Sequence, residues 1–130
     1  MANESVHQVI ADYYRDFSTL NVQAILPYFH APSLLVGPQG VIPIPDRAAL
    51  AAVFGPLMEG LRAKGYGRSE LELGYVKLLS SSAALIGGVA VRYKIDGRLL
   101  ERAGVTYVLH KTARGWKFAT VILHDPNTPA

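Results

Sequence analysis

The sequence predicts an α+β fold, in which three N-terminal helices pack on a strongly curved, mainly antiparallel sheet. Up to about residue 65, apolar residues recur at spacings of three and four, as they do on the buried face of a helix. From residue 68 the period changes to two, which is typical of strands. Because the predicted strands follow one another with almost no loop, we expect a pocket between the helix layer and the sheet.

Composition narrows the class of protein. The chain has 130 residues, of which 50% are apolar and 18% charged, so we expect one domain over residues 1–130. The absence of cysteine excludes a disulfide framework and a thiolate site, and it is compatible with a cytoplasmic protein. The net charge of +3 comes from scattered basic residues, so we expect no nucleic-acid partner. No apolar stretch reaches the roughly 20 residues of a membrane span, and no secretory signal is visible.

Two helices are predicted in the first thirty residues. Ser5 and Gln8 fit a capping box at the start of the first helix. Its apolar face is formed by Val6, Val9, Ile10, Tyr13, Tyr14, Phe17 and Leu20. Asn21 caps a second helix, which we expect to be short or bent because Pro27 lies inside it.

A third helix follows two extended segments. Residues 33–36 favour a short strand, and residues 41–45 cannot form a central strand because two prolines remove backbone donors. Asp46 caps the third helix, and Gly65 ends it. Its predicted buried stripe consists of Leu50, Val53, Phe54, Leu57 and Leu61.

The second half of the chain predicts four strands, over residues 68–79, 84–95, 98–111 and 116–124. Asp96-Gly97 is the strongest hairpin signal in the chain. We expect Gly87-Gly88 to bulge or bend the second of these strands.

Several of these strands are apolar on both faces. In the last one, Trp116, Phe118, Thr120 and Ile122 alternate with Lys117, Ala119, Val121 and Leu123. Only one face can pack on the helices, and the other would leave an apolar patch that soluble monomers avoid. We therefore expect a homodimer through the outer face of the sheet.

The order of these motifs resembles the nuclear transport factor 2-like superfamily. The resemblance covers the whole chain. It consists of Tyr13, Asn21-x-x-Ala24-x-x-x-x-Phe29, a proline-containing segment, a capped third helix and four strands that end on Gly115-Trp116-Lys117-Phe118. The superfamily includes ketosteroid isomerases, limonene epoxide hydrolases and SnoaL-like polyketide cyclases. The resemblance implies a cone-shaped roll whose pocket opens at the wide end, and dimers through the sheet.

The resemblance does not carry the isomerase machinery over intact. Tyr13 matches the tyrosine that donates to the substrate oxyanion, and Thr106 lies where the second donor is expected. The base of those enzymes precedes a proline at the end of the first short strand, where this chain has Gly37. Without a proton acceptor that reaction cannot run.

Two candidate catalytic residues remain, Tyr13 and His124. The hydroxyl of Tyr13, or of its neighbour Tyr14, can donate to a bound ligand, or the ring can fill the core. His124 falls on the same strand face as Trp116 and Phe118, and if that face looks into the cone it could act as an acid or base in the pocket. The alternative is a half-exposed histidine at a strand end.

Other residues are candidates for binding a ligand. Arg102 shares a strand face with Thr106 and would suit an anion if that face is interior, whereas the alternative is a charge in solvent. The remaining candidate binding residues are Tyr14, Phe17, Phe54, Trp116 and Thr120. We expect no metal site, because the histidines share no ligand-like spacing.

Two functions are compatible with these features. The first is a small-molecule pocket protein for an apolar, possibly ring-containing ligand, which could be a cofactor-free isomerase, cyclase or hydratase. The second is a non-enzymatic dimeric module for ligand binding or protein association. The sequence does not decide between an enzyme and a binding protein.

Overall fold

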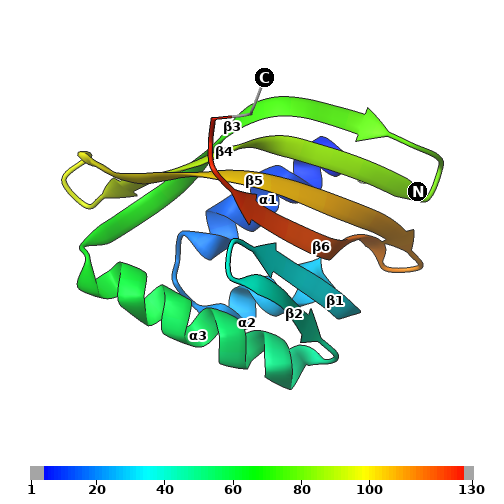
Figure 1. The fold of residues 1–130 in the computed structure, drawn as a ribbon, viewed down its shortest axis with the longest axis horizontal. Helices are drawn as coiled ribbons and strands as arrows, with labels where there is room; N and C mark the ends of the chain where they lie inside the picture. The colour runs from blue at the N-terminus through cyan, green and yellow to red at the C-terminus, as the bar shows by residue number, and fades with distance from the viewer. Residues whose placement is uncertain (1–4, 128–130) are drawn as a thin grey trace.

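The computed structural model describes residues 5–127 and confirms the α+β fold. The helices are α1 (Val6–Phe17), α2 (Val22–Ile25) and α3 (Arg47–Ala63), and a 3-10 turn, η1 (Leu26–Tyr28), follows α2. The strands are β1 (Phe29–Gly37), β2 (Gly40–Ile44), β3 (Tyr66–Leu78), β4 (Ala83–Lys94), β5 (Leu99–Thr112) and β6 (Gly115–His124). They form one six-stranded sheet of order β2-β1-β6-β5-β4-β3 (Figure 1).

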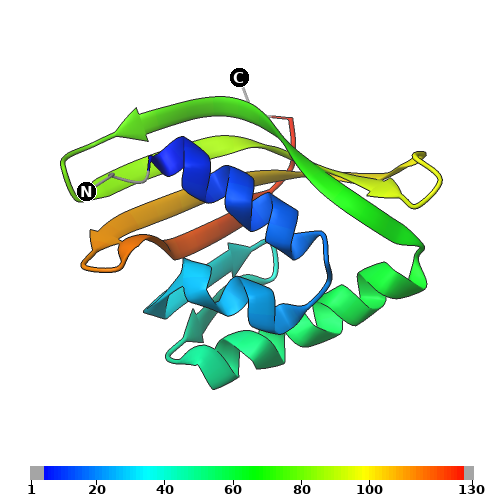
Figure 2. The same ribbon diagram turned by 180° about the vertical axis from the view of Figure 1, so that it is seen from behind.

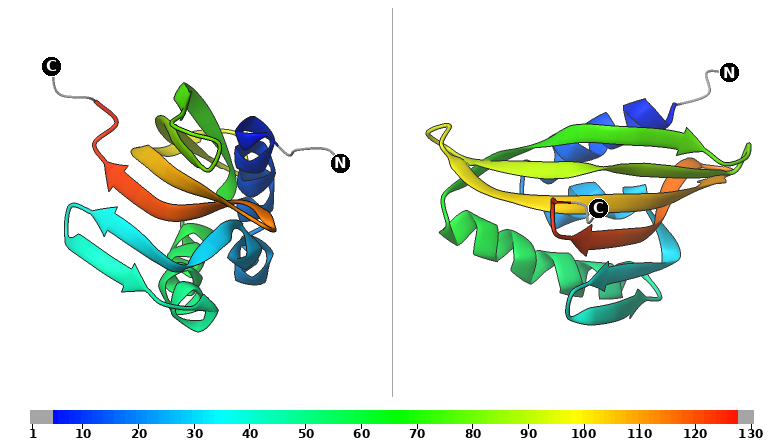
Figure 3. Two further views of the ribbon diagram at one scale, coloured as in Figure 1. Left: turned by 90° about the vertical axis from the view of Figure 1, so that its right-hand side faces the viewer. Right: turned by 45° about the horizontal axis from the view of Figure 1, so that its top comes forward.

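The sheet is curved, and all three helices lie on its concave side (Figures 2 and 3). Only β1 and β6 pair in parallel, and the other neighbouring strands are antiparallel. The extended segment with the prolines is β2, at the edge of the sheet as predicted, where missing backbone donors cost least. Within residues 5–127, no helix combines the length and the apolarity that a membrane span needs.

The helix caps follow the predicted chemistry. The Ser5 hydroxyl accepts from the Gln8 amide at 3.1 Å, and the Asp46 carboxylate accepts from the Ala49 amide at 2.8 Å. The second helix is short, as expected, because the chain enters the 3-10 turn that contains Pro27.

The buried stripe of α3 differs from the prediction at two positions, because Val53 is only partly buried and Leu57 is exposed. Leu50, Phe54 and Leu61 are buried, but Met58 replaces Leu57 in the stripe. Leu57 remains 39% exposed, although its side chain lines the cavity described below.

The strand pairing has several irregularities, and two of them decide on which face the later side chains of β3 and β6 lie. The bulge expected at Gly87-Gly88 lies in the partner strand, where Gly74 is the extra residue between Leu73 and Tyr75. A Cβ atom on Gly88 would come within 2.3 Å of the Glu72 carbonyl oxygen, so glycine permits the close approach of the two strands.

The second bulge lies in β6, at Ala119. Val108 pairs with Thr120 and Leu109 pairs with Phe118, so Ala119 has no partner on β5. A bulge of one residue reverses the side on which all later side chains lie. The strict alternation expected for β6 is therefore wrong after Phe118.

Candidate functional site

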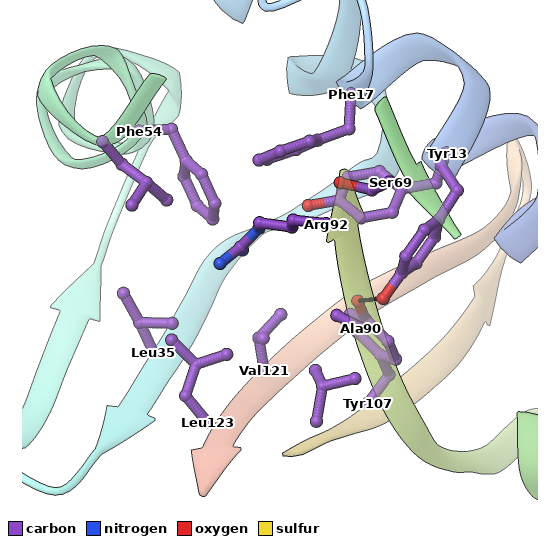
Figure 4. Close-up of a pocket in the computed structure, with 13 residues that line it drawn as sticks. Tyr13, Phe17, Leu35, Phe54, Ser69, Ala90, Arg92, Tyr107, Val121 and Leu123 are labelled. Carbon is purple, nitrogen blue, oxygen red and sulfur yellow. Dashed lines mark hydrogen bonds between the residues drawn. The ribbon is translucent and has the colours of Figure 1, made fainter. Parts of the chain in front are cut away.

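A cavity of about 50 Å³ lies between the helix layer and the concave face of the sheet (Figure 4). Its walls come from α1, β1, α3 and strands β3 to β6. They consist of Tyr13, Tyr14, Phe17, Leu35, Phe54, Leu57, Ser69, Ala90, Arg92, Val105, Tyr107, Val121 and Leu123. Small-molecule sites usually measure about 300–1,000 Å³, so this cavity takes only a small group without rearrangement.

Three tyrosines from α1 and β5 meet at this cavity. The hydroxyl oxygens of Tyr14 and Tyr107 lie 2.8 Å apart and form a hydrogen bond. The ring of Tyr13 lies within 6.2 Å of the rings of Tyr14, Phe17, Tyr28, Phe29, Tyr107 and Phe118. This aromatic cluster joins α1 to the sheet and holds the tyrosines in place.

Burial keeps these tyrosines protonated. It raises the pKa of Tyr14 to about 12, although the hydrogen bond with Tyr107 acts in the opposite direction. It also raises the pKa of Tyr13 and of Tyr107 well above the usual value. At neutral pH all three hydroxyls are neutral and can donate hydrogen bonds, but none is available as a base.

Arg92 brings a positive charge to the same cavity. Its side chain projects from β4 into the space bounded by Phe17, Phe54 and Leu35 (Figure 4) and is only 14% exposed. Its Nη1 donates to Glu101 Oε2 at 3.1 Å, and the guanidinium carbon lies 5.9 Å from the centre of the Phe17 ring. The Nε–H group is buried and has no hydrogen-bond partner.

The sequence profile of a family described as NTF2-like protein (DUF6841) matches residues 3–126. The chain belongs to this NTF2-like family. None of the curated proteins compared with the chain matches it. The family membership confirms the resemblance that the order of motifs indicated.

Solved structures show the same fold. A putative calcium/calmodulin-dependent protein kinase type II association domain from Thiobacillus denitrificans has a TM-score of 0.75 at 14% identity, over 98% of this chain and 99% of that one. An NTF2-like protein with a cystatin-like fold from Novosphingobium aromaticivorans has a TM-score of 0.73 at 16% identity, over 96% and 82%. A ketosteroid isomerase-like protein from Erwinia carotovora atroseptica has a TM-score of 0.68 at 18% identity, over 95% of each chain. At these identities the likeness concerns the fold alone.

Four of the candidate residues of this NTF2-like chain do meet at the cavity. Tyr13, Tyr14 and Phe17 come from α1, and Phe54 comes from α3. Their roles in binding or catalysis stay predictions. Trp116 is buried in the core, and its ring lies 5.9 Å from the Lys111 ammonium, but it does not line the cavity.

The expected interior position of Thr106 is wrong, and of the two alternatives for Arg102 the structure shows the charge outside the cavity. The buried side chains of β5 are those of Val105, Tyr107 and Leu109, so the alternate positions face outward. Burying these three large side chains stabilises the fold more than burying a threonine and an arginine would. Arg102 forms a bidentate ion pair with Glu72 on the outer face, at 2.8 and 3.1 Å.

Of the two alternatives for His124, the structure shows the exposed one at the strand end, because the bulge at Ala119 exchanges the two faces of β6 beyond Phe118. His124 pairs with Gly104, where a Cβ atom would come within 2.5 Å of its Nδ1 atom. Its Nε2 atom lies 3.1 Å from the Thr106 hydroxyl, outside the cavity. Thr120 pairs with Val108 and faces outward for the same reason.

Sequence reasoning missed Arg92 and Tyr107. A signal for Arg92 was present, because it follows Ala84, Ile86 and Ala90 at even spacings on β4, and these three side chains are buried. A charge that continues a buried series is a candidate for an interior site.

Proposed function

We propose that this NTF2-like chain binds a small, mainly apolar molecule at the cavity between its helices and its sheet. The observation that carries the proposal is the lining of the cavity. Its walls are aromatic and aliphatic, and its polar groups are few: the tyrosine hydroxyls, Ser69 and Arg92. This combination is typical of sites that bury an apolar ligand and orient it with a small number of polar contacts.

Binding is supported more strongly than acid–base catalysis. No carboxylate and no imidazole occurs among the residues that line the cavity. The tyrosines cannot accept a proton near neutral pH, since burial raises the pKa of Tyr14 to about 12. Gly37, at the position where the resemblance places a base, has no side chain to supply one.

A ligand screen tests this proposal. Thermal shift and calorimetry would be measured with octanoic acid, octanamide, phenylpropanoic acid and cyclohexanone. We expect at least one of these compounds to bind and to raise the melting temperature. Absence of binding by every compound would overturn the proposal.

Two matched variants locate the site. Ala90 lines the cavity and is 6% exposed, so Ala90→Val fills part of the space and should abolish binding. Ala83→Val makes the same change at the start of β4, away from the cavity, and should leave binding intact. Equal effects of the two substitutions would argue against this location.

The outer face of the sheet supports a second proposal, a homodimer. Its residues include Leu85, Val89, Val108, Thr120 and Ile122, which are all half-buried in the single chain. Tyr75, on the edge strand β3, is 48% exposed. A second copy placed against this face would remove that apolar surface from water.

We also propose a cytoplasmic location. The lack of cysteine supports it, because small proteins of oxidising compartments commonly use disulfides. Cell fractionation of the tagged protein tests it, and recovery outside the cytoplasm would overturn it.

A further inference from the structure

Arg92 is unusual among the charged residues of the described chain because one of its N–H groups is both buried and unpaired. Among residues 5–127, the only buried side-chain nitrogen or oxygen atoms without a partner are Arg92 Nε and Ser33 Oγ. A guanidinium carries five N–H donors and always keeps its charge. A buried donor without an acceptor destabilises the protein, and a bound acceptor relieves that cost.

The charged side chains around Arg92 do not fully neutralise it, so the cluster favours a bound anion. Glu101 accepts from Arg92 at 3.1 Å through one oxygen, and its other oxygen lies 3.7 Å from the Lys64 ammonium. One carboxylate is thus shared by two cations, so this cluster keeps a net positive charge. Because the Arg92 side chain is only 14% exposed, water screens that charge little.

The tyrosine pair adds a donor and no competing negative charge. Each hydroxyl has one hydrogen, and the single bond between Tyr14 and Tyr107 uses one of the two. The second hydrogen is free to point to a ligand oxygen. Both groups stay neutral near pH 7, because burial raises their pKa.

The size of the cavity limits what enters it. A water needs at least about 10–15 Å³, whereas a dry cavity that binds benzene measures about 150 Å³. At about 50 Å³, the cavity takes a small polar head group but not a ring. Leu35 and Leu123 line it and also line a neighbouring groove of about 440 Å³, beside the turn between β1 and β2. An apolar chain or ring attached to the head group can therefore lie along these leucines.

We propose that the ligand is an amphipathic monocarboxylate, whose carboxylate is held by Arg92 inside the cavity and whose apolar part lies over Leu35 and Leu123. This inference rests on the proposed function, since it names the class of ligand for the same site. Arg92 is the specificity-determining residue, because it favours an acid over its neutral amide.

The first test compares acids with neutral amides of the same shape. Octanoate and octanamide, and phenylpropanoate and phenylpropanamide, are titrated into the wild-type protein by calorimetry. We expect each acid to bind about tenfold to a hundredfold more tightly than its amide, the range of a hydrogen-bonded ion pair. Arg92→Gln should remove this preference, because it takes away the charge that distinguishes the acid from the amide. The control Arg102→Gln, on the outer face, should keep the preference.

The outcomes separate the two proposals. Equal binding of acid and amide by the wild type, or a preference that survives in Arg92→Gln, overturns the role of Arg92 and leaves the binding function standing. Binding of neither acids nor amides overturns both.

A second measurement needs no substitution at Arg92 and covers the case in which Arg92→Gln does not fold. Octanoate labelled with ¹³C at the carboxyl carbon is titrated against pH while bound to the wild-type protein. The guanidinium should hold the pKa of the bound acid below that of free octanoic acid, because it favours the charged form. A bound pKa above the free value would overturn the proposal, because it would place the carboxyl in an apolar site without a cation.

Discussion

The hydroxyl oxygens of Tyr14 and Tyr107 lie 2.8 Å apart, in a hydrogen bond that ties α1 to β5 at the wall of the cavity. Both side chains are buried, at 8% and 4% exposed. The helix layer therefore meets the sheet through a polar contact in a mostly aromatic cluster. Each hydroxyl has the other as its hydrogen-bond partner, so the pair depends on how α1 packs against β5.

Removing both hydroxyls of this pair should lower the free energy of unfolding by less than the sum of the two single removals. Tyr14→Phe or Tyr107→Phe leaves one buried hydroxyl without its partner, which should lower the free energy of unfolding by about 1–3 kcal/mol. The double variant leaves no such group, so its loss should be smaller than the sum of the two single losses. Urea denaturation of the four proteins measures this. Strict additivity would contradict the coupling, and Tyr75→Phe, at a 48% exposed position, is the control.

The protein should lose stability in alkaline solution. The pKa of Tyr14 is raised from 10.0 to about 12 in the folded state. Its contribution to stability is thus fully present below pH 10 and is lost as the pH rises from 10 towards 12. Over that window Tyr14 alone should lower the free energy of unfolding by about 1.4 kcal/mol per pH unit. Denaturation at about pH 9 and about pH 11 should show a smaller fall in Tyr14→Phe, and an unchanged fall would refute this account.

The bulge at Ala119 predicts a large and a small change in stability for two neighbouring substitutions of similar shape. Val121 is 6% exposed, so Val121→Thr buries a hydroxyl and should cost about 1–3 kcal/mol. Thr120→Val changes a half-buried position on the outer face and should change stability by less than about 0.5 kcal/mol. Chemical denaturation of both variants tests this. The reverse order of effects would show that β6 alternates without a bulge.

The proposed dimer predicts a change of molecular mass when a charge enters the outer face. Val108 lies half-buried on β5 and pairs with Leu85 and Thr120. Sedimentation equilibrium should show a dimer for the wild type and for Val108→Thr, and a monomer for Val108→Glu, because an unpaired carboxylate does not enter an apolar interface. A wild-type monomer at micromolar concentration would discard the dimer.

Much of the fold follows from local patterns along the chain. The caps at Ser5 and Asp46, the short second helix at Pro27 and the edge position of β2 depend on one or two residues each, so they are readable in the sequence. The candidates on α1 and α3 lie at the cavity for a similar reason. A helix with one apolar face has only one way to turn toward a core.

The strand candidates fared differently, because β5 and β6 are apolar on both faces. For such strands the sequence allows either face to be interior. A bulge of one extra residue exchanges the interior and exterior faces of the residues that follow it. The interior position expected of Thr106 is therefore wrong, and the alternatives left open for Arg102 and His124 are decided by the register of β5 and by the bulge at Ala119. That residues 1–130 form one domain, and that the cavity residues act on a ligand, stay predictions.

The amino-acid sequence by itself determined the order of helices and strands and the caps at which the helices begin, because these depend on periodicity, capping and turn chemistry along the chain. The order of motifs resembled the NTF2-like family, and the matching family profile shows the membership. Only the tertiary structure decided which face of each strand encloses the cavity. That choice brings Arg92 and Tyr107 to the site and takes His124 away from it. That choice depends on how strands that are distant in sequence pair with one another. It also depends on which face of each strand removes more apolar surface from water when it is buried.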